Sequence, residues 1–183
     1  MNRKIILRGI NVGGKRKILM ADLKSMFEKM NFSNVSTYIQ SGNVFFDANK
    51  NIDNALLEKD IEKSIFDEFG FDVPVIVRTP QEIETAISRN PFYKEDADIV
   101  HLHLTFLNER PSAEDQQKAE SYNYEPDKFE VKGKDVFVYC EGKYHQSKLT
   151  NNFFEKKLKV KATTRNWKTM LKFVELNKRN SSG

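Results

Sequence analysis

Hydrophobic positions in the first half of the chain follow two different spacings, and their order predicts a fold. Between residues 19 and 30, apolar residues recur every three or four positions, which is the period of an amphipathic helix. Short apolar runs bounded by Gly, Ser and Asn indicate strands instead. The predicted elements are strands over residues 4–7, 35–39, 44–46 and 73–77 and helices over residues 19–30 and 53–69. Their order is β-α-β-β-α-β.

The same order starts again after a short helix in the middle of the chain. Thr79, Pro80 and Glu82 form a helix-start signature, and Asn90-Pro91 ends that helix. The strands predicted beyond it cover residues 99–107, 129–131, 136–140 and 160–163. Three helices are also predicted: one opens at residues 111–115, and the other two cover residues 147–158 and 166–177. We therefore predict an α+β fold of tandem ferredoxin-like units with mainly antiparallel sheets and an extra C-terminal helix, divided into residues 1–90 and 91–183.

The composition is that of a globular protein without a membrane span. With 39% hydrophobic residues and 14 Phe among 183 residues, the chain can bury a core. No apolar run approaches the roughly 20 residues needed to cross a bilayer. The start of the chain lacks the apolar segment of a signal peptide, and Cys140 is the single cysteine. We therefore expect a cytoplasmic protein without an intramolecular disulfide.

Charged residues form three blocks along the chain. The formal net charge is +6 over residues 1–50, −11 over residues 51–130 and +9 over residues 131–183, whereas the whole chain carries +4. If the two basic ends meet in the fold, they create a local positive surface that attracts anions. A protein that coats nucleic acid usually spreads its positive charge more evenly. The alternative is that the blocks are ordinary solvated helix faces.

The first motif has the sequence RGINVGGK and runs from Arg8 to Lys15. Its spacing G-x-x-x-x-G-K is that of a phosphate-binding loop, and it follows a predicted strand. It does not indicate a nucleotide triphosphatase, because Arg16 stands where a magnesium-binding hydroxyl is needed, the helical pattern begins late and the predicted sheet is antiparallel. Glycines still let backbone N–H groups approach an anion, and Arg8, Lys15, Arg16 and Lys17 favour one. The alternative is a tight connection that needs glycine for its dihedral angles.

A second polar cluster surrounds a predicted turn. Gln40, Ser41 and Asn43 place three hydrogen-bonding side chains around it. A simple hairpin accounts for the Ser-Gly-Asn sequence, but it accounts less well for Gln40 in front of the turn.

A third cluster, with the sequence TTRNWKT, occupies residues 163–169. Arg165 beside the positive end of a predicted helix suits a phosphate or carboxylate ligand. Asn166 could equally be an N-cap. Ser147 and Lys148 open the preceding predicted helix and could join the same surface.

Three segments together resemble a bacterial domain-of-unknown-function family with an LRGINVGG opening and an RNW closing signature. They are residues 7–15 (LRGINVGGK), 37–44 (TYIQSGNV) and 163–169 (TTRNWKT), so the resemblance spans nearly the whole chain. It implies a family placement and a cytoplasmic protein. The family has no established activity, so no catalytic residue carries over from it.

Histidine and cysteine offer weaker candidates. His101 and His103 lie two apart on a predicted strand, hence on one face, and with His145 they could form a three-ligand site. Two histidines in an alternating strand are more often surface or interface residues, so we expect no metal and no cofactor. Cys140 ends an apolar strand and is expected to be a buried, inert thiol.

These observations lead to a hypothesis of binding. We expect a small phosphorylated or nucleotide-like anion on a basic face, in preference to nucleic acid, because the acidic middle segment would repel a long polyanion. An enzyme acting on such a ligand is the competing hypothesis, although no histidine in the clusters supplies a general base. A third hypothesis is that the clusters are structural. Oligomeric state is left open. The candidate ligand-binding residues are Arg8, Asn11, Gly13, Gly14, Lys15, Gln40, Ser41, Asn43, Ser147, Lys148, Arg165 and Asn166.

Overall fold

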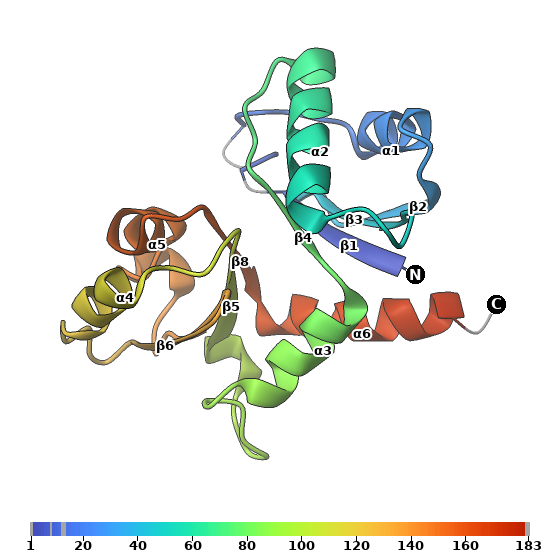
Figure 1. Ribbon diagram of the computed structural model, residues 1–183. Coiled ribbons are helices and arrows are strands. Elements are labelled where there is room, and N and C mark those ends of the chain that lie inside the picture. The colour runs from blue at the N-terminus through green and yellow to red at the C-terminus, as the bar shows by residue number, and fades with distance from the viewer. Residues whose placement is uncertain (1, 8, 12–13, 182–183) are drawn as a thin grey trace. The chain divides into compact units, whose positions relative to one another are not determined.

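The protein forms two compact units, Met1–Pro80 (unit 1) and Gln81–Gly183 (unit 2). The structure is a computed structural model that describes residues 2–7, 9–11 and 14–181 (Figure 1). Each unit has its own four-stranded sheet and its own hydrophobic core.

Unit 1 contains an antiparallel sheet with the strand order β2-β3-β1-β4. β1 lies inside the sheet, where Ile5 stands opposite Val44 of β3 on one side and Val77 of β4 on the other. β4 is therefore an edge strand. The elements are β1 (Asn2–Leu7), α1 (Met20–Lys29), β2 (Ser33–Tyr38), β3 (Asn43–Asp47), α2 (Asn54–Phe69) and β4 (Val75–Arg78).

Helices α1 and α2 cover one face of this sheet (Figure 1). Local sequence sets both ends of α2. The Asp53 carboxylate accepts hydrogen bonds from the backbone N–H groups of Ala55 and Leu56, and Gly70 at φ 73° ends the helix. The core between the helices and the sheet includes Leu23, Phe27, Val44, Phe46, Leu57, Ile61, Ile65, Val75 and Val77.

Two glutamates of α2 bind the backbone of β4. The Glu58 carboxylate accepts a hydrogen bond from the N–H of Val77 at 2.8 Å, and the Glu62 carboxylate accepts one from Val75 at 2.9 Å. Acidic residues of a helix are usually solvated, but here Glu58 is buried and Glu62 is half-buried. They satisfy the N–H groups that an edge strand leaves without a strand partner.

Unit 2 repeats the arrangement with the strand order β6-β7-β5-β8 in an antiparallel sheet. Helix α3 (Pro80–Arg89) leads into it along the chain. The further elements are β5 (Leu102–Leu107), α4 (Ala113–Glu120), β6 (Lys128–Lys132), β7 (Asp135–Tyr139), α5 (Asn151–Leu158), β8 (Ala162–Asn166) and α6 (Trp167–Ser181).

In unit 2, α4 and α5 cover one face of the sheet and α6 packs against β5 and β8 (Figure 1). The core between this sheet and helices α4 and α5 includes Leu107, Val136, Val138, Cys140, Phe154 and Leu158. Cys140 is buried, and burial raises the pKa of its thiol, as expected for an inert cysteine. On α6, the side chains of Trp167, Met170 and Phe173 are buried.

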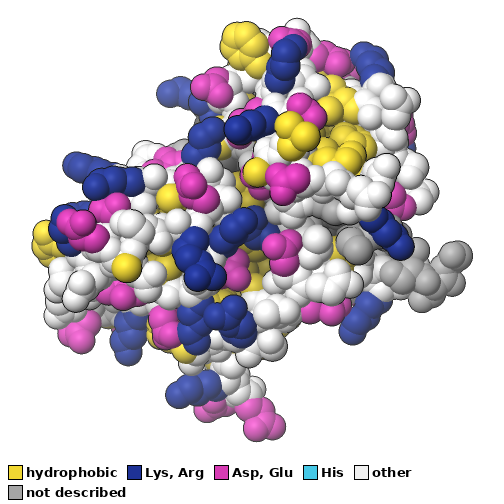
Figure 2. All heavy atoms as spheres, viewed as in Figure 1, with side chains coloured by type: hydrophobic (Ala, Val, Ile, Leu, Met, Phe, Trp, Pro, Cys, Tyr) yellow, Lys and Arg dark blue, Asp and Glu magenta, His cyan; other side chains and the backbone are white. Residues whose placement is uncertain are grey.

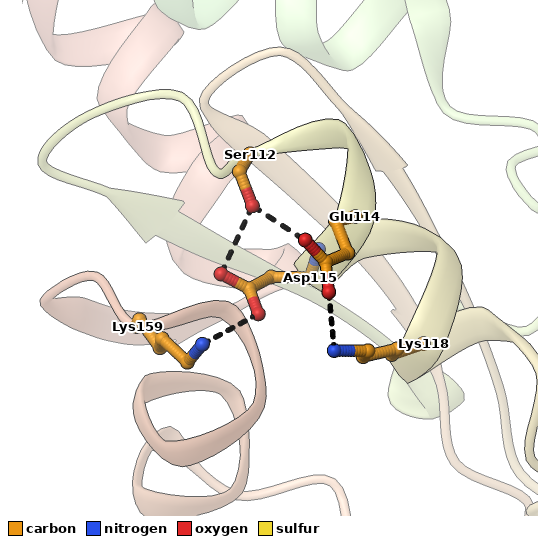
Figure 3. Close-up of polar contacts among 5 residues, drawn as sticks. All are labelled: Ser112, Glu114, Asp115, Lys118 and Lys159. Carbon is orange, nitrogen blue, oxygen red and sulfur yellow. Dashed lines mark hydrogen bonds and ion pairs between the residues drawn. The ribbon is translucent and has the colours of Figure 1, made fainter.

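Helices α4 and α5 are joined at their ends by a polar contact (Figure 3). Ser112 caps α4 by accepting a hydrogen bond from the N–H of Asp115, within the segment 111–115 where the sequence predicts that a helix opens. The ammonium group of Lys159, the residue that ends α5 at φ 57°, lies 2.9 Å from the Asp115 carboxylate. Hydrogen bonds from Lys159 and Ser112 lower the pKa of Asp115.

Several predicted boundaries differ from the structure, three of them for reasons that the local contacts show. Residues 99–101 form a 3-10 turn instead of the start of a strand, because the Asp98 carboxylate caps the N–H of Val100. Helix α5 begins at residue 151, since the hydroxyl of Thr150 caps it. Residues 164–166, predicted as a connection and helix start, belong to β8, where they pair with β5.

The structure shows an α+β fold with antiparallel sheets, and both units have the predicted order β-α-β-β-α-β. Within the described residues, no helix combines the length and the apolar character that a membrane crossing requires. Figure 2 shows Lys and Arg side chains interspersed with Asp and Glu over the visible face.

Candidate anion-binding site

The loop after β1 contains the first motif and has an unusual backbone. Gly9, Asn11, Gly14 and Arg16 all have positive φ, between 50° and 73°. Such angles suit glycine and asparagine, but they are uncommon for an arginine. The N–H of Asn11 donates to the carbonyl of Arg16 at 3.1 Å and closes the loop. Two residues predicted in the site, Arg8 and Gly13, lie outside the described residues.

The Asn11 side chain connects this loop to the hairpin between β2 and β3. Its Nδ2 donates to the carbonyls of Ile18 at 2.8 Å and Gln40 at 2.9 Å, and its Oδ1 accepts from the N–H of Ile18 at 2.9 Å. The first and second motifs, 29 residues apart at Asn11 and Gln40, therefore meet in unit 1.

The hairpin itself is stabilised by Asn43. This buried side chain donates through Nδ2 to the carbonyl of Tyr38 at 3.1 Å and to the hydroxyl of Ser41 at 3.0 Å. The turn has positive φ at Ile39 (51°) and Gly42 (80°). Gln40, in contrast, is exposed at the tip. Asn43 and Ser41 thus shape the turn that carries Gln40.

A pocket lies where the loop and the hairpin meet. Its volume is about 320 Å³. Described residues from both motifs line it, together with the start of α1: Asn11, Gly14, Lys17, Ile18, Leu19, Met20 and Gln40. A side chain at Gly14 would meet no atom within 4 Å, so the space above this glycine is open.

The loop carries three cations beside the pocket. Lys15, Arg16 and Lys17 are all exposed, and in the described part of the chain none of them pairs with a carboxylate. The guanidinium of Arg16 lies over Gly9, where an added Cβ would be 2.9 Å from Nη1. The pocket therefore has a positive border that internal ion pairs do not neutralise.

Leu19 is a lining residue that the sequence did not suggest. Its place in the helical pattern indicated a core position, but it is 72% exposed at the N-cap of α1. Ile39 at the hairpin tip is 50% exposed. A β-branched residue at positive φ is unusual, and the sequence alone does not show this backbone angle.

The third cluster, residues 163–169, lies in unit 2, and so do Ser147 and Lys148, which the sequence suggested as neighbours of it. The hydroxyl of Ser147 donates to the Asp127 carboxylate at 2.6 Å and accepts from the N–H of Leu149 at 3.1 Å. Lys148 is exposed. Ser147 thus stabilises the connection before α5.

Arg165 and Asn166 sit at the end of β8. Arg165 is buried, and among its hydrogen bonds Nη1 donates to the hydroxyl of Thr163 at 3.1 Å and to the carbonyl of Thr164 at 2.9 Å. Burial lowers the pKa of Arg165 to about 10, so it remains a cation at neutral pH. Asn166 Oδ1 accepts from the N–H of Thr169 at 2.8 Å and caps α6.

The histidines of unit 2 have separate surroundings. His101 Nδ1 donates to the carbonyl of Cys140 at 2.8 Å, while the buried His103 ring stacks on Tyr144 with centroids 4.5 Å apart. His145 is exposed. Among the described residues, no group of three His, Cys, Asp or Glu side chains is arranged to hold a metal ion.

Comparison with known proteins places the fold in a family. A solved structure of a conserved bacterial protein from Streptococcus pneumoniae is similar over 95% of this chain and 97% of its own length, with 25% sequence identity and a TM-score of 0.74. Among curated proteins, none matches the chain. The family model described as "protein of unknown function (DUF1697)" matches residues 1–137, which contain the first and second motifs but not the third. The chain therefore belongs to the DUF1697 family of proteins of unknown function.

Proposed function

We propose that the pocket of unit 1 binds a small phosphorylated or nucleotide-like anion. The observation that carries this proposal is the convergence of two sequence motifs and a cationic loop on one pocket. Lys17 lines the pocket directly, and Lys15 and Arg16 flank it without carboxylate partners in the described residues. A cation that no carboxylate neutralises attracts an anion over roughly the Debye length of about 8 Å at physiological salt.

Backbone geometry supports the same ligand. The positive φ of Gly14 and the open space above it let a ligand oxygen approach the main chain without meeting a side chain. The amide of Gln40 at the hairpin tip adds a neutral hydrogen-bonding group to the lining. Residues held at rarely populated angles, here Arg16 and Ile39, cluster at functional sites more often than elsewhere.

The apolar border favours a ligand that is more than a bare phosphate. Leu19 lines the pocket with 72% of its surface exposed, and Ile39 is exposed at the adjacent hairpin tip. A sugar or a base attached to the anionic group would cover part of this apolar surface and gain roughly 25 cal/mol for each Å² removed from water.

The proposal is one of binding, since the described lining offers a lysine and two amides but no histidine or carboxylate that could act as a general base. It rests on residues of unit 1. The contacts of Ser147, Arg165 and Asn166 in unit 2 are those of structural side chains.

Calorimetric titration of the full chain tests the proposal with inorganic phosphate, ribose 5-phosphate, AMP and adenosine. We expect AMP to bind more tightly than phosphate and adenosine to bind weakly, because it lacks the charged group. A ligand at about 100 times its dissociation constant should raise the free energy of unfolding by roughly 2.7 kcal/mol.

Lys17→Ala should weaken AMP binding about tenfold, the effect of losing one charge-assisted hydrogen bond. Lys50→Ala is the matched control, because Lys50 is also exposed in unit 1 and does not line the pocket. Equal affinities for AMP in the two variants would exclude the pocket as the binding site. Release of phosphate from AMP during the titration would make the protein an enzyme instead.

A further inference from the structure

Unit 2 contains a larger cavity that is separate from the sequence motifs. Its volume is about 640 Å³, within the range of about 300–1,000 Å³ typical of small-molecule sites. It lies among the segment after α3, the segment before β6 and the end of β7. The lining residues are Pro91, Phe92, Lys94, Glu125, Pro126, Lys128, Tyr139 and Glu141.

Two aromatic rings form the apolar part of this cavity. The rings of Phe92 and Tyr139 have centroids 6.3 Å apart and are tilted by 52°. The ring of His101 contacts Tyr139 at 5.5 Å and is itself held by its hydrogen bond to the carbonyl of Cys140. The N–H of Phe92 donates to the side chain of Asn90 at 2.9 Å. These contacts hold both aromatic residues in place, and the tilted pair suits a flat ligand ring that stacks on one of them and meets the other at an angle.

Charged side chains of both signs surround Phe92 and Tyr139 and do not form ion pairs with one another. Lys94, Lys128, Glu125 and Glu141 are all exposed and line the same cavity. In the described part of the chain, none of these four side chains forms an ion pair. Lys128 on β6 stands directly opposite Tyr139 on β7, so this cation lies beside the aromatic residues. The cavity thus offers two cations and two anions, with a net charge of zero.

We propose that this cavity binds an aromatic zwitterion, a free amino acid or a short peptide with an aromatic side chain. The ligand ring stacks on one of the Tyr139 and Phe92 rings and contacts the other at an angle, its carboxylate meets a lysine and its ammonium group meets a glutamate. A nucleotide fits less well, because its phosphate brings about two negative charges to a site whose glutamates repel them. The site is independent of the anion pocket of unit 1.

L-Tryptophan is the first probe, titrated into the full chain by calorimetry. Tryptamine lacks its carboxylate and indole-3-propionate lacks its ammonium group, so the pair tests each charge separately. We expect saturable binding of tryptophan and about tenfold weaker binding of both analogues, since each loses one charge-assisted contact. Alanyl-tryptophan distinguishes the sources: tighter binding than tryptophan indicates a peptide, and weaker binding indicates a free amino acid. AMP is the nucleotide arm.

Two double variants assign the charges. Lys94→Ala with Lys128→Ala should weaken tryptophan and indole-3-propionate but leave tryptamine unchanged. Glu125→Gln with Glu141→Gln should weaken tryptophan and tryptamine but leave indole-3-propionate unchanged. All four residues are exposed, so thermal unfolding midpoints should not move. Lys156→Ala and Glu109→Gln, exposed residues of unit 2 that do not line the cavity, are the matched controls.

Three results overturn the inference. The first is no saturable tryptophan binding up to millimolar concentration. The second is binding that the charge variants do not change. The third is binding of AMP through Lys94 and Lys128 in preference to tryptophan. AMP binding that depends on Lys17 and not on these lysines concerns the pocket of unit 1, so the two proposals fail independently.

Discussion

Asn11 holds the candidate anion site together through a single side chain. Its amide makes hydrogen bonds with the backbone of Ile18 on one side and Gln40 on the other, and its own φ is 53°. Asparagine tolerates this left-handed angle better than most residues. Asn11 therefore combines two roles, as a conformational element and as a connection, and it positions Gln40 at the pocket.

Asn11→Ala should lower the free energy of unfolding by about 2–3 kcal/mol. It removes the hydrogen bonds to Ile18 and Gln40, and it replaces an asparagine with an alanine, which tolerates a positive φ less well. Asn11→Gly removes the same bonds without the dihedral penalty, so it should be more stable than the alanine variant by about 1 kcal/mol. Urea unfolding measures both. Alanine and glycine variants of equal stability would show that the angle carries no strain.

The two asparagines also show what a sequence can and cannot reveal about this site. Asn11 and Asn43 belong to motifs that the sequence identifies, and the structure brings both motifs together. Their hydrogen-bond partners include backbone carbonyls, one of them 29 residues away, and no local pattern indicates such a partner. A sequence therefore identifies a polar motif more readily than it separates the residues that shape a site from the residues that would face a ligand.

His103 makes unit 2 sensitive to acid. Burial lowers the pKa of this imidazole below its ordinary value of 6.5, so the unfolded chain takes up a proton at higher pH than the folded chain. The contribution of neutral His103 to the free energy of unfolding is complete above pH 6.5, and it decreases as the pH falls towards the folded pKa. His103→Gln should flatten this dependence between pH 5 and 7, and His145→Gln, at an exposed position, should not. Urea midpoints at each pH measure the slope, and an unchanged slope in His103→Gln contradicts the assignment.

Helix carboxylates cover an edge strand in both units. Glu58 and Glu62 of α2 accept from the backbone of β4, and Glu155 of α5 accepts from the N–H of Ala162 on β8 at 3.1 Å. β4 and β8 occupy the same place in the two strand orders, each beside the first strand of its unit. Unpaired N–H groups on an edge invite pairing with another chain. The glutamate contacts therefore cover the equivalent edge strand in each unit.

Glu58→Ala should lower the free energy of unfolding by about 2 kcal/mol, because it leaves the N–H of Val77 buried without this acceptor. Glu58→Gln retains an Oε1 that can accept, so it should lose less than half as much. Asp60→Ala, exposed on the same helix, is the control and should change little. Chemical unfolding of the three variants decides, and a glutamine variant as unstable as alanine would mean that the charge, not the hydrogen bond, matters.

Local signals explain which elements the sequence predicts well. Asp53 and Gly70 bracket α2, and the predicted helix differs from the observed one by a single residue at its start. The start of α5 differs from the predicted one because the hydroxyl of Ser147 binds Asp127, twenty residues earlier, and Thr150 is the cap instead. A cap competes with tertiary hydrogen bonds for the same side chain, and only the fold decides between them.

The charge blocks of the sequence do not correspond to the units of the structure. The acidic segment 51–130 spans the boundary, so unit 1 holds twelve Lys and Arg against ten Asp and Glu, and unit 2 holds eighteen against sixteen, a net charge of +2 for each. The two basic ends belong to different units. Local charge beside each pocket, rather than the total of either unit, is therefore what a ligand encounters.

Lys17 and Arg165, one cation from each basic end, separate a single-unit site from a joint face. Lys17 is exposed at the pocket, whereas Arg165 is buried and bonds to Thr163 and Thr164 of its own strand. We expect Lys17→Ala to weaken AMP binding about tenfold without loss of stability. Arg165→Ala should lower the free energy of unfolding by about 2–3 kcal/mol, since hydrogen bonds of a buried guanidinium are lost, and should leave AMP affinity unchanged. Calorimetric titration and urea unfolding of both variants give the four values. A stable Arg165→Ala variant with lost AMP binding would assign this guanidinium to the ligand, and the site would then need both ends of the chain.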